Sequence, residues 1–234
     1  MTDFDYCPRL REIITSGYAN LPNGEKIPTG GTTSTPNNLR IIRHFILAEK
    51  PESTLEIGLA FGASALVFLS SMKEVRPTGF NHTAIDPFQT GHWKSAAIFN
   101  IKSVGLMDHF THLEQDSALV LPELCKQERR YNIVYVDGSH IFENVFIDFY
   151  YYCCRLLVGD GLILFDDCTD RHIAKVIRFI DTNYSKYLRR ECTKGLVPLS
   201  FKRRVGHAVG IRQLSVYRKI AEPPREWDVP FANF

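Results

Sequence analysis

Residues 54–64 constrain the fold of this chain more than any other segment. Their sequence, TLEIGLAFGAS, joins a short apolar stretch to a helical pattern that starts at Ala63 and runs to about Met72. This order predicts a strand, a glycine-bearing turn and a helix. In an open α/β sheet, ligands bind in the crevice outside the carboxyl ends of the strands, where such a turn lies. The segment therefore predicts an α/β fold with a ligand site beside the turn.

The glycine spacing of this turn indicates which ligand it suits. Gly58 lets the backbone turn sharply, and Gly62 lets it approach a ligand without a Cβ in the way. A dinucleotide site would need G-x-G-x-x-G with amides aimed at a pyrophosphate, but the spacing here is E-x-G-x-x-x-G, and Glu56 would repel a phosphate. A ligand with an ammonium group fits better. The segment resembles the first motif of the class I S-adenosylmethionine (SAM)-dependent methyltransferases; the alternative is a plain strand-to-helix turn in another α/β protein.

Composition narrows the class of protein. The chain has 234 residues, with 44% hydrophobic and 23% charged residues, which is ordinary for one globular domain. The net charge of +2 is too small for a nucleic-acid footprint, and the basic runs at 189–190 and 202–204 have no interleaved aromatic residues. We therefore expect no nucleic-acid partner.

The cysteines and the apolar runs indicate the cellular compartment in which the protein is expected. The six cysteines are scattered and form no C-x-x-C pair, so neither a disulfide framework nor a zinc site is expected. The N-terminus lacks a basic-then-apolar signal pattern, and no apolar run approaches the roughly eighteen residues needed to span a bilayer. We expect a cytoplasmic protein without a membrane partner.

Short apolar runs alternate with longer amphipathic runs from Leu55 onward, as in a parallel sheet wrapped by helices. The expected strands are 54–57, 82–85, 111–114, 133–136 and 162–165. The expected helices are 63–72, 92–104, 118–126, 143–157 and 171–183, and the GDG sequence at 159–161 predicts a turn. Residues 196–201 and 207–217 predict an antiparallel edge pair, since Pro198 cannot donate to a ladder. We predict a doubly wound, Rossmann-like α/β fold with a seven-stranded mixed sheet and helices on both faces.

The two ends of the chain depart from this alternation. Residues 1–50 predict two helices, 9–16 and 38–49, joined by a loop at 21–35 rich in Gly, Pro, Ser and Thr. This segment is expected to be a surface loop, a lid over the site or a homodimer contact. Residues 51–221 are expected to form the SAM-dependent methyltransferase domain, and residues 222–234 an irregular tail.

Polar residues follow each expected strand. Asp86, after the second strand, can accept both hydroxyls of a ribose; the alternative is a turn or capping role before Pro87. Asp116 and Ser117, after the third strand, are placed to reach an adenine. Ser64, near the start of the first sheet helix, is placed to hold a carboxylate with the exposed helix amides. We assign cofactor contacts to Glu56, Gly58, Gly62, Ser64, Asp86, Asp116, Ser117 and Asp137.

Carboxylates end the fourth and fifth strands. Asp137, Asp166 and Asp167 are expected to converge on one small volume, where their repulsion calls for a counter-ion. Oxygen-only ligation favours Mg²⁺ over zinc, with Mn²⁺ or Ca²⁺ as alternatives. Asp166 or Asp167 could instead cap the following helix, although Asp170 lies closer to its start.

His140 stands three residues after Asp137 on the loop that leaves the fourth strand. Its ordinary pKa leaves it mostly neutral at cytoplasmic pH, as a general base requires. The alternative is a polar surface residue. Phe88 and Trp93 are expected either in the walls of an acceptor pocket or in the core.

The residues from Leu55 to about Asp181 resemble the metal-dependent small-molecule O-methyltransferases, of the catechol type and of the macrolide-sugar type represented by macrocin O-methyltransferase. The VDGSH segment at 136–140, the aromatic-rich helix after it and the GDGLILFDD segment at 159–167 are most similar to the macrocin-type group. The resemblance implies that Asp137, Asp166 and Asp167 bind Mg²⁺ and that His140 is the general base. Catechol-type enzymes end the last motif in Asn, where this chain has Asp167.

The resemblance implies SAM-dependent, metal-assisted methyl transfer to a hydroxyl of a small molecule such as a natural product, a sugar or a phenol. Three alternatives stay open: a metal-independent small-molecule methyltransferase, an antibiotic-pathway hydroxylase-like protein, and a non-catalytic SAM-binding protein.

Overall fold

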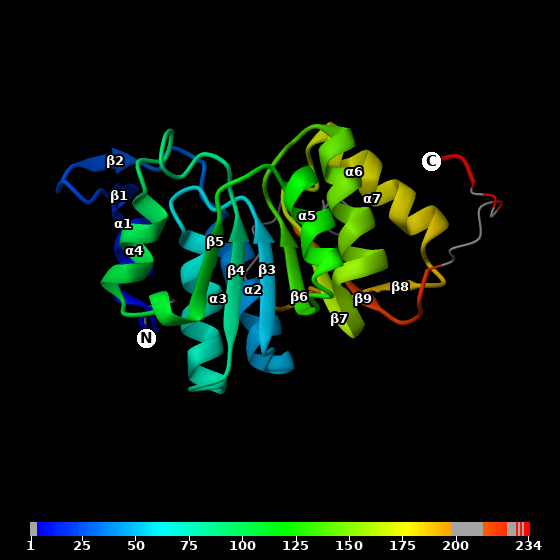
Figure 1. The fold of residues 1–234 in the computed structure, drawn as a ribbon, viewed down its shortest axis with the longest axis horizontal. Coiled ribbons are helices and arrows are strands. Elements are labelled where there is room, and N and C mark those ends of the chain that lie inside the picture. The colour runs from blue at the N-terminus through cyan, green and yellow to red at the C-terminus, as the bar shows by residue number, and fades with distance from the viewer. Residues whose placement is uncertain (1–3, 198–212, 224–227, 229, 231) are drawn as a thin grey trace. The chain divides into compact units, whose positions relative to one another are not determined.

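A computed structural model describes residues 4–197, 213–223, 228, 230 and 232–234 of the chain, except the side chains of residues 153 and 154 (Figure 1). The chain forms two compact units, residues 1–117 and 118–234.

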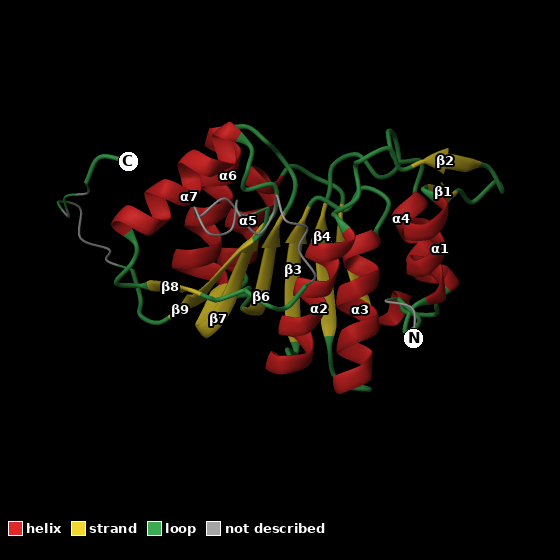
Figure 2. Ribbon diagram, turned by 180° about the vertical axis from the view of Figure 1, so that it is seen from behind, coloured by secondary structure: helices red, strands yellow, loops and turns green. Residues whose placement is uncertain are grey.

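The first unit is built on three parallel strands, β3 (Ser53–Ile57), β4 (Asn81–Ile85) and β5 (Phe110–Leu113). Ile57 pairs with Ile85, and Ile85 with Leu113, so the carboxyl ends of the three strands lie level. The helices of this unit are α1 (Pro8–Ser16), α2 (Pro36–Glu49), α3 (Ala63–Val75) and α4 (Ala96–Ser103), with a short 3-10 helix, η1 (Met107–His109). Helices α2 and α3 lie against one face of the strands (Figure 2).

The second unit contains two parallel strands, β6 (Tyr131–Val136) and β7 (Leu157–Phe165), followed by an antiparallel pair. Strand β9 (Ser215–Lys219) runs antiparallel to β7 and to β8 (Leu188–Arg190). The helices are α5 (Ser117–Lys126), α6 (Phe142–Tyr151), continued by a π-helical turn η2 (Tyr152–Leu156), and α7 (Arg171–Asn183). Helices α6 and α7 pack on one another beside β6 and β7 (Figure 1).

The strands of both units form one seven-stranded mixed sheet in the order β5-β4-β3-β6-β7-β9-β8. The predicted doubly wound α/β fold is therefore confirmed. In the part of the chain that the structure describes, no helix is both long and apolar enough to cross a membrane.

The N-terminal segment is a packed part of the first unit. The predicted loop at 21–35 is wrong in part, because β1 (Tyr18–Asn20) and β2 (Lys26–Pro28) form an antiparallel hairpin there. Ala19 and Leu21 are buried in one cluster with Phe61 and Ala96. The hairpin is thus anchored against the turn that follows β3. These short, largely polar strands lack the period-two apolar pattern by which a strand is predicted.

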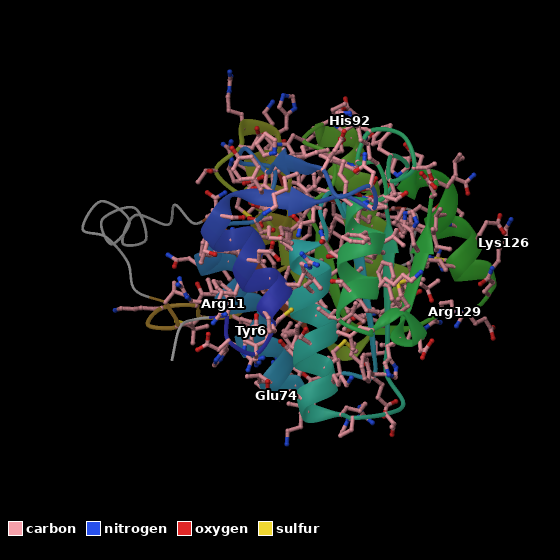
Figure 3. All side chains as sticks on the ribbon, turned by 90° about the vertical axis from the view of Figure 1, so that its left-hand side faces the viewer. Tyr6, Arg11, Glu74, His92, Lys126 and Arg129 are labelled. Carbon is pink, nitrogen blue, oxygen red and sulfur yellow. The ribbon has the colours of Figure 1, made fainter. Side chains whose placement is uncertain are left out.

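An arginine side chain also anchors the residues before α1. The guanidinium of Arg43 on α2 lies 3.7 Å from the centre of the Tyr6 ring. The same group makes a 2.7 Å ion pair with Glu74 on α3; Tyr6 and Glu74 are labelled in Figure 3. Burial raises the pKa of the Tyr6 hydroxyl well above its ordinary value. Residues before α1 are therefore held to both helices that cover this face of the sheet.

Three further predictions require correction. The GDG sequence at 159–161 is no turn between elements but lies within β7, where the pairing with β6 shifts from Tyr131–Leu157 to Ile133–Leu162. A Cβ on Gly161 would lie 2.9 Å from the carbonyl oxygen of Asn132, so the glycine is required at this irregularity.

The antiparallel pair at the sheet edge exists, but its strands are 188–190 and 215–219. Residues 196–197 form a bend, and 198–201 and 207–212 lie outside the described residues. Helix α4 begins at Ala96 rather than at the predicted residue 92, because Lys94 and Ser95 before it have positive φ angles of 49° and 58°.

Candidate active site

The turn after β3 is held by its own backbone. Gly58 has a φ of 90° and donates its N–H to the carbonyl of Ile85 at 2.9 Å. Gly62 has a φ of 82°, donates to the carbonyl of Leu59 at 2.7 Å and caps α3. Both glycines occupy the left-handed region, which L side chains rarely adopt. Ala60 is also strained there, with a φ of 42°.

The packing of α4 gives a second reason for a glycine at position 62, which the sequence did not show. A Cβ at this position would lie 3.0 Å from the Cβ of Ala97 in α4. The glycine therefore lets a neighbouring helix pack against the turn. Its predicted contact with a cofactor stays a prediction.

Asp86 fixes the turn from the neighbouring strand. Its Oδ2 accepts the N–H groups of Leu59 at 3.0 Å and Ala60 at 2.9 Å, while its Oδ1 accepts the N–H of Phe88 at 2.8 Å. The side chain is almost fully buried. The bond from Phe88 confirms the turn alternative, and the lone pair left on Oδ1 is compatible with the predicted ribose hydroxyl.

Two buried amides support the same turn and were not predicted. Gln89 donates to the carbonyl of Ala60 at 2.8 Å and to Oδ2 of Asp86 at 3.3 Å. Asn100 donates to the carbonyl of Phe61 at 3.0 Å. Because one lies in a loop and the other on the next helix, spacing in the sequence gave no signal for either.

Glu56 lies on β3 with both carboxylate oxygens buried. Its Oε1 lies 3.2 Å from Nε2 of His82 on β4, and both side chains are fully buried. The contact is not aligned as a hydrogen bond, and neither oxygen of Glu56 nor Nε2 of His82 has a hydrogen-bond partner among the described residues. A buried carboxylate without a full set of donors suits a cationic ligand group. The ammonium group expected at this turn therefore fits.

The other predicted cofactor residues lie at helix starts. Ser64 is the second residue of α3 and is buried, whereas Ser117 opens α5 and is half-buried. Asp116, just before α5, is exposed. Trp93 is half-buried and packs edge-on against Phe61 of the buried cluster, with 5.1 Å between ring centres, whereas Phe88 is exposed.

Two of the three predicted metal ligands meet in the second unit. The hydroxyl of Tyr135 on β6 contacts Oδ2 of Asp137 at 3.0 Å and also Oδ2 of Asp166. Asp166 is almost fully buried, and its Oδ1 accepts the N–H of Asp167 at 2.8 Å. Since one hydroxyl reaches both carboxylates, the two oxygens lie within a few ångströms of each other.

Asp167 turns toward His140 instead. Its Oδ2 lies 3.2 Å from Nε2 of His140, and its Oδ1 accepts the amide of Gln213. Nδ1 of His140 lies 3.7 Å from Oδ2 of Asp170, and the His140 side chain is 49% exposed. His140 is therefore flanked by two carboxylates and open to solvent, a geometry that suits a proton acceptor.

Asp170, rather than Asp166 or Asp167, caps the helix after this loop. Its Oδ1 accepts the N–H of His172 at 2.8 Å, at the start of α7. This hydrogen bond is the main cause that holds the pKa of the Asp170 carboxyl below its ordinary value, and His140 and His172 also lower it.

A known protein family and several solved structures are similar to this chain. Residues 55–168 match the family model described as a methyltransferase domain. No curated protein matches the chain.

Solved structures share the fold at low identity. The SAH-bound methyltransferase PaMTH1 of Podospora anserina has a TM-score of 0.63 at 14% identity, covering 92% of this chain and 88% of that one. An O-methyltransferase of Bacillus cereus in complex with SAH has a TM-score of 0.65 at 13% identity, covering 92% and 90%. TomG of Streptomyces achromogenes, an O-methyltransferase involved in tomaymycin synthesis and solved with SAM, has a TM-score of 0.61 at 13% identity, covering 82% and 83%. The chain thus has the methyltransferase fold.

The donor set fits a hard cation in kind, because Asp137 and Asp166 offer closely spaced carboxylate oxygens. The arrangement differs from the predicted three-carboxylate site. Among the described residues, no group of three or more His, Cys, Asp or Glu side chains is placed to hold a metal ion. Asp167 instead uses its oxygens on His140 and Gln213, and its metal role stays a prediction.

Tyr135 and Gln213 are the residues of this region that the sequence analysis missed. Tyr135 stands two residues before Asp137. Because residues two apart in a strand point to the same face, the sequence could have predicted that the two side chains lie together. Gln213 is 46 positions from Asp167 and offered none.

Proposed function

We propose that this protein transfers a methyl group from SAM to a hydroxyl of a small molecule. The observation that carries the proposal is the buried Glu56 carboxylate beside a glycine turn, within the stretch that matches a methyltransferase domain. SAM, when bound, supplies a methyl group activated by its sulfonium.

The first unit provides the cofactor contacts. Oε2 of Glu56, which lacks a hydrogen-bond partner among the described residues, accepts the ammonium group. Ser64 and the amides at the start of α3 hold the carboxylate. Oδ1 of Asp86 would accept a ribose hydroxyl, and Asp116 with Ser117 would contact the adenine. Gly58 and Gly62 keep the turn open to the ligand.

The second unit provides the proton acceptor. Nε2 of His140 faces Oδ2 of Asp167 at 3.2 Å, so Nδ1 would be the nitrogen that takes the proton of the acceptor hydroxyl. The acceptor oxygen would bond to the methyl carbon as the carbon–sulfur bond of SAM breaks, and S-adenosylhomocysteine would leave. Asp167 and Asp170 stabilise the resulting imidazolium. General-base assistance of this kind contributes about 10²–10⁴ in rate.

A divalent cation, with Mg²⁺ as the first choice, is part of this proposal. Asp137 and Asp166 would hold it, with Asp167 as a third ligand after it releases Gln213. Such a cation supplies Lewis-acid stabilisation of the acceptor oxygen. The acceptor is proposed to be a natural product or a sugar hydroxyl, or else a phenol; the role of TomG in tomaymycin synthesis supports the first. Residues 1–50 are proposed to serve as a lid or a homodimer contact.

Calorimetry tests the cofactor first. Wild-type protein is titrated with S-adenosylhomocysteine with and without Mg²⁺, and binding is expected in both conditions. Hydroxylated sugars, phenols and natural products are then screened with SAM for methylated products. No binding of S-adenosylhomocysteine in either condition would contradict the proposal at its first step.

One observation favours a metal-independent version of the same reaction. His140 lies between two carboxylates and needs no cation to act as a base. Turnover that survives EDTA would support this version, whereas loss of turnover that only a divalent ion restores would support the metal-assisted one.

A further inference from the structure

Thr54, Glu56 and His82 form a buried polar group behind the turn of the first unit. All three side chains are fully buried. The pairing of β3 with β4 sets Thr54 beside His82, and Glu56 lies two residues further along the same face of β3. Burying a carboxylate and an imidazole together is costly, and an apolar pair of similar volume would often be at least as stable. Stability alone therefore gives no reason for this group.

The orientation of the His82 ring is fixed on three sides. The ring stacks on Phe68 of α3 at 4.7 Å and lies 6.0 Å from the ring of Phe110 on β5. Its Nδ1 lies 2.8 Å from the hydroxyl oxygen of Thr54. The remaining ring nitrogen, Nε2, therefore has one direction to face, which is toward Oε1 of Glu56 at 3.2 Å.

Two proton arrangements of the His82 ring place an N–H beside Glu56. If the Thr54 hydroxyl donates to Nδ1, a neutral ring carries its proton on Nε2. If Thr54 donates instead to the sulfur of Met72, 3.3 Å away, Nδ1 donates to Thr54, and the ring also carries a proton on Nε2 only as an imidazolium. In the neutral ring of the first arrangement and in the imidazolium of the second, an N–H lies beside Oε1 of Glu56 and stabilises a negative charge there.

We propose that His82 is a positioning residue for the cofactor. Its Nε2 lies against Oε1 of Glu56 and sets the direction of the carboxylate, so that Oε2, which has no hydrogen-bond partner among the described residues, is left for the ammonium group of SAM. This inference rests on the proposed function, because it takes that ammonium group as the ligand of Glu56.

Two substitutions of similar size and polarity separate the two ring nitrogens. In His82→Asn the amide nitrogen can occupy the position of Nδ1 and leaves Glu56 without a neighbouring N–H, whereas in His82→Gln it can occupy the position of Nε2. Each variant is titrated with S-adenosylhomocysteine and with 5′-methylthioadenosine, which keeps the adenosine and the thioether but lacks the amino-acid part.

We expect His82→Asn to raise the Kd for S-adenosylhomocysteine about tenfold or more, and His82→Gln to raise it less than about threefold. The Kd for 5′-methylthioadenosine should change less than about twofold in both, because this ligand has no ammonium group. In a Glu56→Gln background, His82→Asn should have no further effect on either ligand, since His82 acts through Glu56.

Equal weakening of both ligands by His82→Asn would mean a merely structural role and overturn the inference, as would unchanged binding of S-adenosylhomocysteine. If His82→Asn does not fold, as judged by thermal unfolding, Thr54→Val replaces it. That variant frees Nδ1, and the Kd for S-adenosylhomocysteine alone must then rise about threefold; an unchanged Kd overturns the inference. If wild-type protein binds 5′-methylthioadenosine but not S-adenosylhomocysteine, the inference fails along with the ammonium site. If it binds neither ligand, the proposed function itself fails.

Discussion

The carboxylate of Asp86 in the first unit is bound by backbone N–H groups of the turn it supports, whereas the carboxylates of the second unit are bound largely by side chains. Leu59, Ala60 and Phe88 donate to Asp86 from the main chain. Tyr135 contacts Asp137 and Asp166, and His140 and Gln213 contact Asp167. The side chain of Asp86 is buried, while those of His140 and Asp167 are partly open to solvent.

This difference matches two chemical tasks. A turn fixed by main-chain bonds is organised before its ligand arrives, so less free energy is lost on binding. Side-chain pairs can exchange partners when a substrate, a proton or an ion enters. We therefore expect substitutions in the turn region to change affinity and stability, and substitutions in the acidic region to change turnover.

The largest effect is expected for His140→Ala. Turnover should fall about 10²–10⁴-fold, because the proton acceptor is lost. The Kd for S-adenosylhomocysteine should stay within about twofold of wild type, since no turn residue is touched. Single-turnover methyl transfer and calorimetry on the same preparation measure the two quantities.

His172→Ala is the matched control, because His172 is a nearby histidine whose backbone N–H, rather than its ring, bonds Asp170. It should keep near wild-type turnover. If His140→Ala turned over as fast as His172→Ala, His140 would have no part in the mechanism.

The second effect in size is expected for Gly62→Ala. The substitution places a methyl group 3.0 Å from the Cβ of Ala97 at a φ of 82°. Left-handed backbone and crowding together should lower the free energy of unfolding by about 2–4 kcal/mol, and cofactor affinity should fall as well. Urea unfolding measures the first quantity and calorimetry the second.

Gly79→Ala is the control for backbone strain alone. Gly79 has a φ of 71°, and among the described residues nothing beyond its chain neighbours lies within 4 Å of the place that a Cβ would take. The substitution should cost less than Gly62→Ala and leave cofactor affinity unchanged. Equal losses in the two variants would show that the contact with Ala97 does not matter.

The same contrast explains what the sequence could predict. The strand, turn and helix at 54–64 follow from local apolar pattern and glycine position, and the structure has β3, the turn and α3 there. The carboxylates at the ends of β6 and β7 also follow, because strand ends are visible in the sequence. Local pattern could not show that Gly62 faces Ala97 or that Asp86 bonds the amides of Leu59 and Ala60.

Long-range partners limited the prediction elsewhere. Gln213 reaches Asp167 only because β9 lies against β7, a pairing set by the whole sheet. The predicted turn at 159–161 failed for the same reason. The GDG sequence signals a local change of direction, but pairing with β6 and β9 keeps the chain within one strand.

A smaller effect is expected for Asp86→Asn, which keeps the shape and removes the charge. One side-chain oxygen becomes an amide that cannot accept an N–H from the turn or from Phe88. Unfolding should become easier by about 1–3 kcal/mol, the cost of leaving a buried donor unpaired, and cofactor affinity should fall. Turnover at saturating cofactor should change little. A large loss of turnover with unchanged cofactor affinity would contradict the assignment of cofactor binding to the turn region and of turnover to the acidic region.

The smallest effect is expected for Asp170→Ala in the acidic region. Loss of the cap on α7 should lower the free energy of unfolding by about 1 kcal/mol at neutral pH, while Asp170→Asn, an equally good cap, should cost little. The folded protein holds the pKa of Asp170 below its ordinary value, chiefly through the N–H of His172. The stabilisation is therefore full above the unfolded pKa and is lost as pH falls through the lower folded value. Urea unfolding of wild type and Asp170→Ala at pH 7 and in acid measures the gap, which should narrow in acid because protonation removes the charged acceptor; a gap that stayed constant would mean that this carboxylate does not cap the helix in its ionised form.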